Sequence, residues 1–202
     1  MRDLFFHSPW PGIIAWALIY ISDFVFTMTC ARLYRRSIGS KIVFEGSFEL
    51  NPIFQRDVDS LRLFSPKFIA MLLATSTVLT LYWYATVATM PEFYVFVLGA
   101  MLGSELAIHI RHLTNLYLFG SRSTADQVRG RIEYARPLIL RMSSVQVLGF
   151  AILFAIVFGF TGSLFVAGSA TSCFFLALKH WVLARRADHA RTKKAEQAAA
   201  TC

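Results

Sequence analysis

The sequence has few charged residues, and this shortage excludes most kinds of soluble protein. Asp, Glu, Lys and Arg make up 16% of the 202 residues, whereas soluble domains carry roughly 25%. Apolar residues account for 56%, and the mean hydropathy is +0.53. A disordered chain, a coiled coil and an ordinary soluble enzyme all need more charge than this. The composition predicts a protein that crosses a membrane several times.

Cysteines are also scarce, and the familiar catalytic motifs are missing. Cys30, Cys173 and Cys202 are far apart and odd in number, which argues against a disulfide framework. The sequence contains no nucleophile elbow, H-E-x-x-H zinc motif, phosphate-binding loop, dinucleotide fingerprint or potassium-channel filter. The stretches between the apolar runs are too short for a soluble catalytic domain. Any chemistry is therefore expected from side chains within or beside the spans.

Five apolar runs are long enough to cross a bilayer, which takes about 20 residues. The expected spans cover residues 11–33, 65–88, 92–119, 142–160 and 164–184. The predicted fold class is all-α, a polytopic bundle of five transmembrane helices. Residues 1–186 form this domain, and residues 187–202 form a basic, Ala-rich cytoplasmic tail. The second and third spans, and the fourth and fifth, are joined so closely that each pair is expected to form a hairpin.

Basic residues gather in three segments that an odd number of spans places on one side of the membrane. The first segment carries Arg32, Arg35, Arg36, Lys41, Arg56 and Arg62, the second Arg122, Arg129, Arg131, Arg136 and Arg141, and the third Arg185, Arg186, Arg191, Lys193 and Lys194. The amino terminus carries only Arg2. Because basic segments stay in the cytoplasm, we expect the amino terminus outside and the carboxyl terminus inside. The clusters would attract anionic lipid headgroups; no nucleic-acid recognition motif accompanies them.

The connection between the first two spans, residues 37–63, differs from an ordinary loop. Hydrophobic and acidic residues interleave between Lys41 and Gln55, and Pro52 follows Asn51. Asn before Pro favours a turn or the start of a helix. We expect an amphipathic segment against the cytoplasmic end of the bundle, with a plain interfacial helix as the simpler interpretation.

Four ionisable residues lie inside the expected spans, where each is costly and marks a candidate site. They are Asp23 in the first span and Glu105, His109 and His112 in the third. At 100° per residue, the last three lie within about 60° of one another on one helix face. A carboxylate and two imidazoles on one stripe suit a divalent metal ion or a proton relay. Arg111 lies on another face and is expected to reach the headgroups.

The first span carries a matching stripe of residues spaced by three and four. Its members are Trp16, Tyr20, Asp23, Thr27 and Cys30. Asp23 should face the bundle, because a lone Asp facing lipid costs about 2.5–3.5 kcal/mol. Glu49 could fold back onto the same end, which would bring three carboxylates and two imidazoles together.

Each of these residues also has a simpler structural interpretation. Asp23 would pair with a basic residue such as Lys67. Glu105 and His109 would form a hydrogen-bonded pair that fixes the register of the helix. His112 would be an interfacial histidine.

A small-residue motif lies in the third span. The spacing Gly99-x-x-x-Gly103 would let another helix approach closely, either within the chain or from a second copy. A homo-oligomer is therefore expected.

Two short stretches resemble a pattern found in small, uncharacterised prokaryotic membrane proteins. In those proteins an Asp-x-x-x-Thr pair in the first span precedes a G-x-x-E-x-N-P segment. The corresponding residues here are Asp23, Thr27, Gly46, Glu49 and the pair Asn51-Pro52, within about 30 residues of the chain. The resemblance does not include residues 105–112. It implies a multi-pass protein of the prokaryotic inner membrane and says nothing about activity.

Transport is the first function that these residues suggest. Asp23, Thr27, Glu105 and His109 would form an intramembrane site for a cation or a proton in a channel or carrier. Carboxylates supply hard oxygen ligands, and histidines couple movement to pH. Polar residues are few in the outer half of the bundle, which counts against a pore through one subunit.

The alternative is a membrane-embedded, metal-dependent enzyme that acts on a lipid or on another substrate reaching the leaflet. Asp23, Glu105, His109 and His112 would then hold a divalent metal ion of unknown identity. Glu49 and Glu105 are the candidate catalytic carboxylates, with Glu49 placed to activate a bound water. A non-catalytic subunit of a membrane complex is the further alternative.

Overall fold

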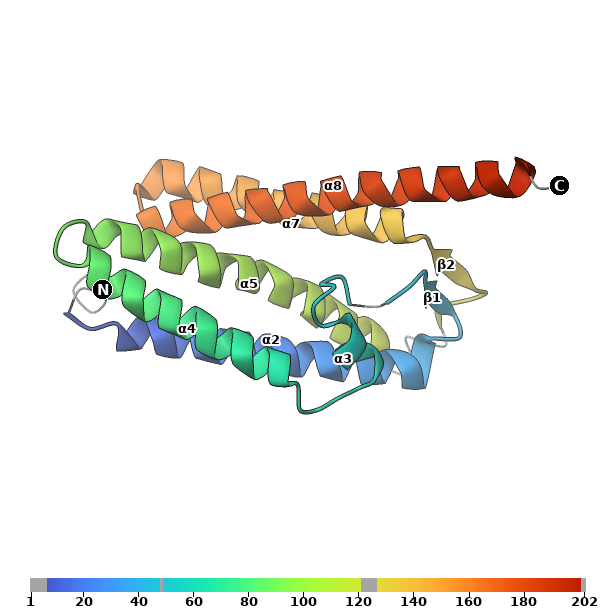
Figure 1. Cartoon of the computed structure of the whole chain (residues 1–202), viewed down its shortest axis with the longest axis horizontal. Helices are drawn as coiled ribbons and strands as arrows, with labels where there is room; N and C mark the ends of the chain where they lie inside the picture. The colour runs from blue at the N-terminus through green and yellow to red at the C-terminus, as the bar shows by residue number, and fades with distance from the viewer. Residues whose placement is uncertain (1–6, 48, 121–126, 201–202) are drawn as a thin grey trace.

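The computed structural model describes residues 7–47, 49–120 and 127–200, so Arg2, Arg122 and Cys202 lie outside the described residues. Five long helices run along one axis (Figure 1). They are α2 (Trp10–Leu33), α4 (Pro66–Thr86), α5 (Pro91–Gly120), α7 (Arg136–Thr161) and α8 (Leu164–Ala200). All five are long and apolar enough to span a bilayer. This confirms the predicted polytopic bundle of five helices.

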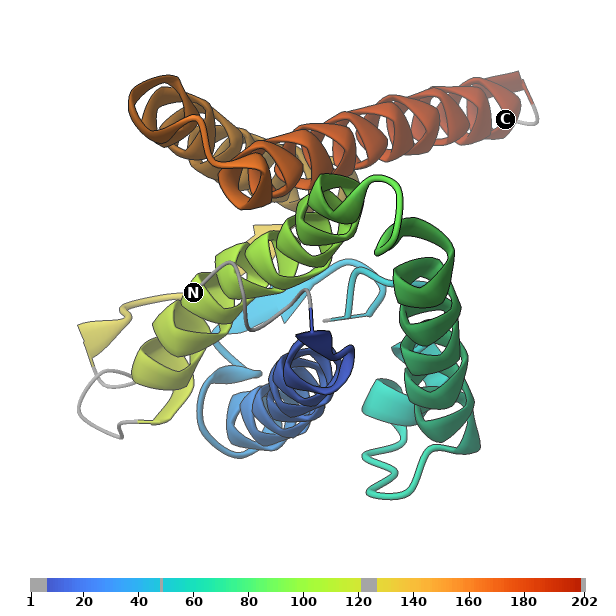
Figure 2. The same cartoon turned by 90° about the vertical axis from the view of Figure 1, so that its left-hand side faces the viewer.

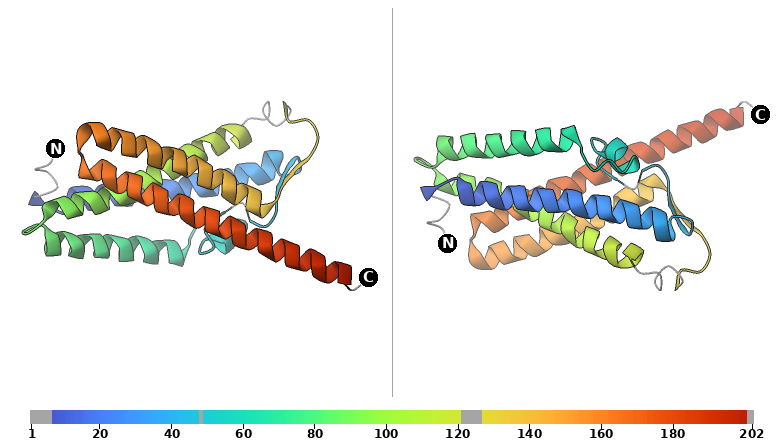
Figure 3. Two further views of the ribbon diagram at one scale, coloured as in Figure 1. Left: turned by 90° about the horizontal axis from the view of Figure 1, so that it is seen from above. Right: turned by 90° about the horizontal axis from the view of Figure 1, so that it is seen from below.

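Most helices begin and end near the expected residues because local signals stop them. Pro91 opens α5, and Gly162 ends α7 in a left-handed conformation with φ +60°. Two bounds differ from expectation. α7 already begins at Arg136, and α8 continues as one helix to Ala200, beyond the expected end of the fifth span at residue 184. Figure 3 shows this last part of α8 projecting beyond the other helices.

The bundle has two different ends. At the turn end, short connections join α4 to α5 and α7 to α8. At the opposite end, which we call the basic end, lie residues 34–65, residues 127–135 and the carboxyl-terminal part of α8 (Figure 1). The basic clusters within the described residues gather at this end, as the span count requires.

The connection at the basic end holds a small sheet that the sequence did not suggest. A π-helical turn, η1 (Tyr34–Ile38), leads to β1 (Ile42–Phe44), and α3 (Gln55–Asp59) follows further along. β1 pairs in parallel with β2 (Ile132–Tyr134). Residues 37–47 and 49–63 therefore lie against the bundle as expected. The simpler interpretation of one interfacial helix is wrong, since the segment is a strand, a loop and a helix of five residues.

α5 is the central helix of the bundle (Figure 2). One side of α5 packs on α8, and another packs on α2, while α7 packs mainly on α8. A Cβ atom at Gly99 would overlap the Phe165 carbonyl, and one at Gly103 would overlap Ser169. The Ser169 hydroxyl also donates a hydrogen bond to the Gly99 carbonyl at 2.9 Å. The small-residue motif is therefore used within the chain.

Candidate metal centre and adjoining cavities

The polar stripes of α2 and α5 face each other in the half of the bundle nearer the basic end. Asp23 on α2 and Glu105 and His109 on α5 each offer one ligand atom, and these atoms lie within 4.8 Å of one another. Glu105 and His109 stand one helical turn apart, so both reach toward the same point of α2. Carboxylate oxygens and an imidazole nitrogen are suitable ligands for a divalent transition metal. These three residues form a candidate metal-ligand group.

Two buried side-chain atoms around this group have no partner among the described residues. They are Glu105 Oε2 and His112 Nδ1. Buried polar atoms are normally paired, and leaving one unpaired costs about 1–3 kcal/mol. One of the two atoms belongs to a candidate ligand. A bound cation would satisfy the Glu105 oxygen that the described residues leave unpaired.

Both ring nitrogens of His109 have hydrogen-bond partners, and these partners fix its tautomer. Its Nδ1 lies 2.7 Å from the backbone carbonyl of Glu105. Because a carbonyl only accepts, the proton is on Nδ1, and in the neutral ring the lone pair is on Nε2. Nε2 lies 2.7 Å from the Ser22 hydroxyl. This is the tautomer that metal-binding histidines adopt when a second group fixes the ring.

The Glu105 carboxylate takes no part in this hydrogen bond. The interpretation of Glu105 and His109 as a side-chain pair that fixes the helix register is therefore wrong. The helix backbone orients the imidazole, and the carboxylate remains free to bind a ligand.

His112 does not join the group of three ligands. It is 2% exposed, so its interpretation as an interfacial histidine is wrong. Its Nε2 lies 3.0 Å from Asp23 Oδ1 and 3.2 Å from Thr27 Oγ1. The proposed pairing of Asp23 with Lys67 is also wrong, because Lys67 donates to the Ile53 carbonyl at 3.4 Å. His112 instead orients Asp23.

A cavity of about 280 Å³ lies beside these residues, and we call it the inner cavity. Asp23, Thr27, Glu49 and Asn51, which are separated in the sequence, all line it. Its lining also includes Glu105, Arg111, His112, Lys179 and His180. The inner cavity therefore gathers polar side chains from α2, α5, α8 and the 45–54 loop.

Glu49 reaches the inner cavity because its loop is held by its own side chains. The Glu49 carboxylate accepts the Asn51 backbone N–H at 2.6 Å, and the Asn51 side chain accepts that of Ile53 at 3.2 Å. Such Asx-type bonds stabilise a turn without a helix or strand. Burial raises the pKa of the Glu49 carboxyl above its ordinary value, while the Asn51 N–H and the Arg111 guanidinium oppose this shift.

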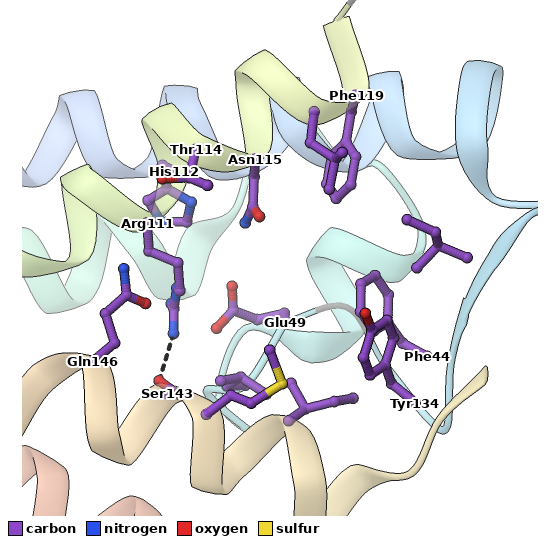
Figure 4. Close-up of a pocket in the computed structure, with 15 residues that line it drawn as sticks. Phe44, Glu49, Arg111, His112, Thr114, Asn115, Phe119, Tyr134, Ser143 and Gln146 are labelled. Atoms are coloured by element: carbon purple, nitrogen blue, oxygen red, sulfur yellow. Dashed lines mark hydrogen bonds between the residues drawn. The ribbon is translucent and has the colours of Figure 1, made fainter. Parts of the chain in front are cut away.

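Arg111 is a site residue that the sequence reasoning missed. It lines the inner cavity and a second, larger one, and its guanidinium donates to the Ser143 hydroxyl at 2.9 Å (Figure 4). Arg111 therefore points into the bundle, toward α7, and not outward as expected. Its position next to His112 was the available signal, since a neighbouring face of α5 can also point into the bundle. Ser22 was missed as well, although it immediately precedes Asp23.

Comparisons with protein-family models, curated proteins and solved structures find no match to this chain. What the structure establishes is a multi-pass membrane protein with five candidate spans and a candidate group of metal ligands.

Proposed function

We propose that this chain is a membrane carrier that binds a divalent cation, in exchange with protons, at Asp23, Glu105 and His109. The observation that supports this proposal is the convergence of three ligand atoms within 4.8 Å of one another, one of them on Glu105, whose buried Oε2 has no partner among the described residues. Two carboxylates balance the charge of a divalent cation, and a neutral complex is much easier to bury than a separate charge. Protons can neutralise the same two carboxylates when the cation leaves.

The closed turn end favours a carrier over a channel. The inner cavity extends from Asn51 and Leu183 at the basic end to Trp16 and Thr75 deeper in the bundle. There the Trp16 indole donates to the Thr75 hydroxyl at 2.9 Å. Beyond this point, Trp16 packs with Leu79, Trp83, Tyr94 and Leu98 in an apolar cluster. A site that opens toward one end at a time is what alternating access requires.

The test combines metal binding with transport by the purified full chain. Isothermal titration with Zn²⁺, Mn²⁺ and Ca²⁺ would measure affinity, and liposomes with an internal pH dye would measure proton movement driven by each cation. Glu105→Gln and His109→Ala should weaken binding at least about 100-fold, because changing even a neighbour of a ligand costs about 10–100-fold. Both should abolish cation-driven proton movement.

Glu92→Gln is the matched control, since Glu92 is an exposed carboxylate at the start of the same helix. It should bind and transport like the unchanged chain. Proton-coupled flux that survives both Glu105→Gln and His109→Ala would exclude these residues from transport. Absence of metal binding and of flux in the unchanged chain would leave a non-catalytic subunit as the better description.

A metal-dependent enzyme is the second candidate, and the position of Glu49 favours it. Glu49 lines the same cavity as Asp23 and Glu105, yet it comes from a loop outside the helices. A carboxyl whose pKa is raised by burial is suited to general acid–base catalysis on a metal-bound water. Metal that binds with high affinity but drives no flux in liposomes would favour this alternative.

We also propose an inner-membrane location with the basic end in the cytoplasm and anionic headgroups around it, as the basic clusters and the short resemblance suggest. A homo-oligomer remains part of the proposal. Gly99 and Gly103 no longer support it, because α8 already covers them.

A further inference from the structure

A second cavity, of about 430 Å³, lies between α5, α7 and the β1–β2 sheet, and we call it the outer cavity. Glu49, Leu50, Arg111 and His112 line both cavities and form the wall between them. Figure 4 shows polar side chains toward one end of the outer cavity and the aromatic rings of Phe44, Phe119 and Tyr134 toward the other. Its volume lies within the range of small-molecule sites, about 300–1,000 Å³. One end of the cavity is polar and the other is apolar, which matches the headgroup and the hydrocarbon part of an amphiphile.

The wall between the cavities carries a hydrogen-bond acceptor without a donor. The Asp23 carboxylate beside His112 Nε2 can only accept a proton, so in the neutral ring the N–H is on Nε2 and the lone pair on Nδ1. Nδ1 is buried and has no partner among the described residues. A ligand with an N–H or O–H group would satisfy it.

The polar end also carries a guanidinium and a carboxyl group with unused hydrogen-bonding capacity. Of the five N–H donors of Arg111, one is used in the described structure, by Ser143, and no ion pair to Arg111 is found there. Glu49 points into the cavity (Figure 4), and its carboxylate accepts one backbone N–H, from Asn51. A ligand that matches both residues carries an anionic group for Arg111 and a cationic N–H donor for Glu49.

The outer cavity reaches the exposed surface of α5 and α7. Thr114 on α5 and Met142 on α7 line the cavity and are both exposed. Exposed apolar side chains flank them on the same two helices: Leu113 and Tyr117 on α5, and Leu138 on α7. Since α5 and α7 are membrane-spanning helices, a hydrocarbon chain that leaves between them enters the bilayer.

We propose that the outer cavity binds the headgroup of an ethanolamine phospholipid. The phosphate lies against Arg111, the primary ammonium donates to Glu49 and His112 Nδ1, and the acyl chains leave between α5 and α7. A choline headgroup carries the same charges but has no N–H for His112. A glycerol headgroup has hydroxyl donors but no cation for Glu49. This inference does not depend on the proposed cation site.

Native mass spectrometry of the full chain would test the assignment. The chain is purified in the presence of equal amounts of phosphatidylethanolamine, phosphatidylglycerol and phosphatidylcholine, and the retained lipids are counted. Phosphatidylethanolamine should be retained at least about tenfold over phosphatidylcholine, because hydrogen bonds to charged groups are the strong ones. Soluble phosphoethanolamine should displace it only at far higher concentration, since it lacks the acyl chains.

Two variants and one control separate binding from folding. Arg111→Gln should reduce the preference for ethanolamine at least about tenfold. Met142→Trp should block the mouth from an exposed position, so the fold is retained, and metal affinity measured on the same sample should not change. Arg131→Gln removes an equal charge from an exposed site outside the cavity and should have no effect.

Several results would overturn the assignment. Equal retention of the choline lipid, or a preference unaffected by Arg111→Gln and Met142→Trp, would show that the cavity does not select this headgroup. Preference for phosphatidylglycerol would assign an anionic lipid instead. Equal binding of phosphoethanolamine would assign a soluble ligand.

Discussion

At the scale of single residues, the site is defined by polar atoms that the fold brings together but does not pair. His109 is oriented by a backbone carbonyl at one ring nitrogen and by the Ser22 hydroxyl at the other. His112 faces the Asp23 carboxylate with Nε2, while its Nδ1 has no partner among the described residues, and neither has Glu105 Oε2. Two such neighbouring atoms are costly in a folded chain, and binding a ligand would offset this cost.

The stability of the chain should depend on pH through Glu49. The pKa of its carboxyl is raised in the folded state above the ordinary value of 4.5. Between these two pKa values the folded chain holds the proton that the unfolded chain has lost, so stability falls as pH rises through this interval. The substitution Glu49→Gln removes this loss of stability with rising pH. The amide oxygen of the new side chain can still accept the Asn51 N–H. The Tm of this variant should therefore exceed that of the unchanged chain by a margin that grows as the pH rises from 4.5 through the raised pKa.

Thermal unfolding in detergent across this pH range would measure the margin. Glu92→Gln, a change at an exposed carboxylate of the turn end, should follow the unchanged chain at every pH. A Glu49→Gln variant that loses stability as pH rises would show that the ionised carboxylate is stabilising, contrary to the direction given above.

The sequence predicted part of this site, and the limit has a physical reason. Helical periodicity alone places Glu105, His109 and His112 on one stripe, because it depends on a single helix. It cannot show that Arg111 meets Ser143, since this contact depends on how α7 lies against α5. Asp23 pairs with His112 and not with Lys67, and this choice depends in the same way on the rotation of α2 about its axis.

At the scale of the elements, α5 serves two purposes with two of its faces. Its small residues, Gly99 and Gly103, allow α8 to approach closely, while Glu105 and His109 further along face α2. The close contact with α8 fixes the rotation of α5. The packing of one face thereby sets the direction of the ligands on the other.

Gly103→Ala tests this close packing. The added Cβ would overlap Ser169 on α8, and overpacking of this kind costs about 1–3 kcal/mol. The midpoint of thermal unfolding should therefore fall. Gly149→Ala is the matched control, because a Cβ there meets nothing within 4 Å. It should be neutral or stabilising by about 0.5–1 kcal/mol, since Gly is unfavourable inside a helix. Equal destabilisation by both changes would contradict the packing argument.

The elements themselves were predictable to different degrees. Long apolar runs and the residues Pro91 and Gly162 were enough to find the five helices and their hairpins. The pairing of β1 with β2 was not predictable, because each strand has three residues and about 90 residues separate them. Such short parallel pairs leave no periodic signal in the sequence, and their stability comes from packing on the bundle, where Ile42 is buried with Phe119.

At the scale of the whole molecule, both cavities and the candidate ligands belong to the half of the bundle nearer the basic end. The turn end is closed by the Trp16 cluster and has short connections. The side of the membrane that the basic end faces therefore decides from which compartment a cation, a substrate or a lipid reaches the site. The charge rule predicts the cytoplasm for this end.

Cysteine labelling would test the orientation. Thr89 lies exposed in the α4–α5 turn and Arg131 lies exposed at the basic end, so single cysteines at these positions report opposite sides. Cys30 and Cys173 are 0% exposed and should not react with a membrane-impermeant maleimide; Cys202 is replaced by Ser. In intact cells Thr89→Cys should be labelled and Arg131→Cys should not, until the membrane is permeabilised.

The reverse pattern would mean that the basic end faces the outside. Labelling of both in intact cells would contradict an arrangement in which α4 and α5 cross the membrane. Because both cavities lie in the half of the bundle nearer the end that carries Arg131, this one measurement also determines on which side the cation should be added in the transport assay.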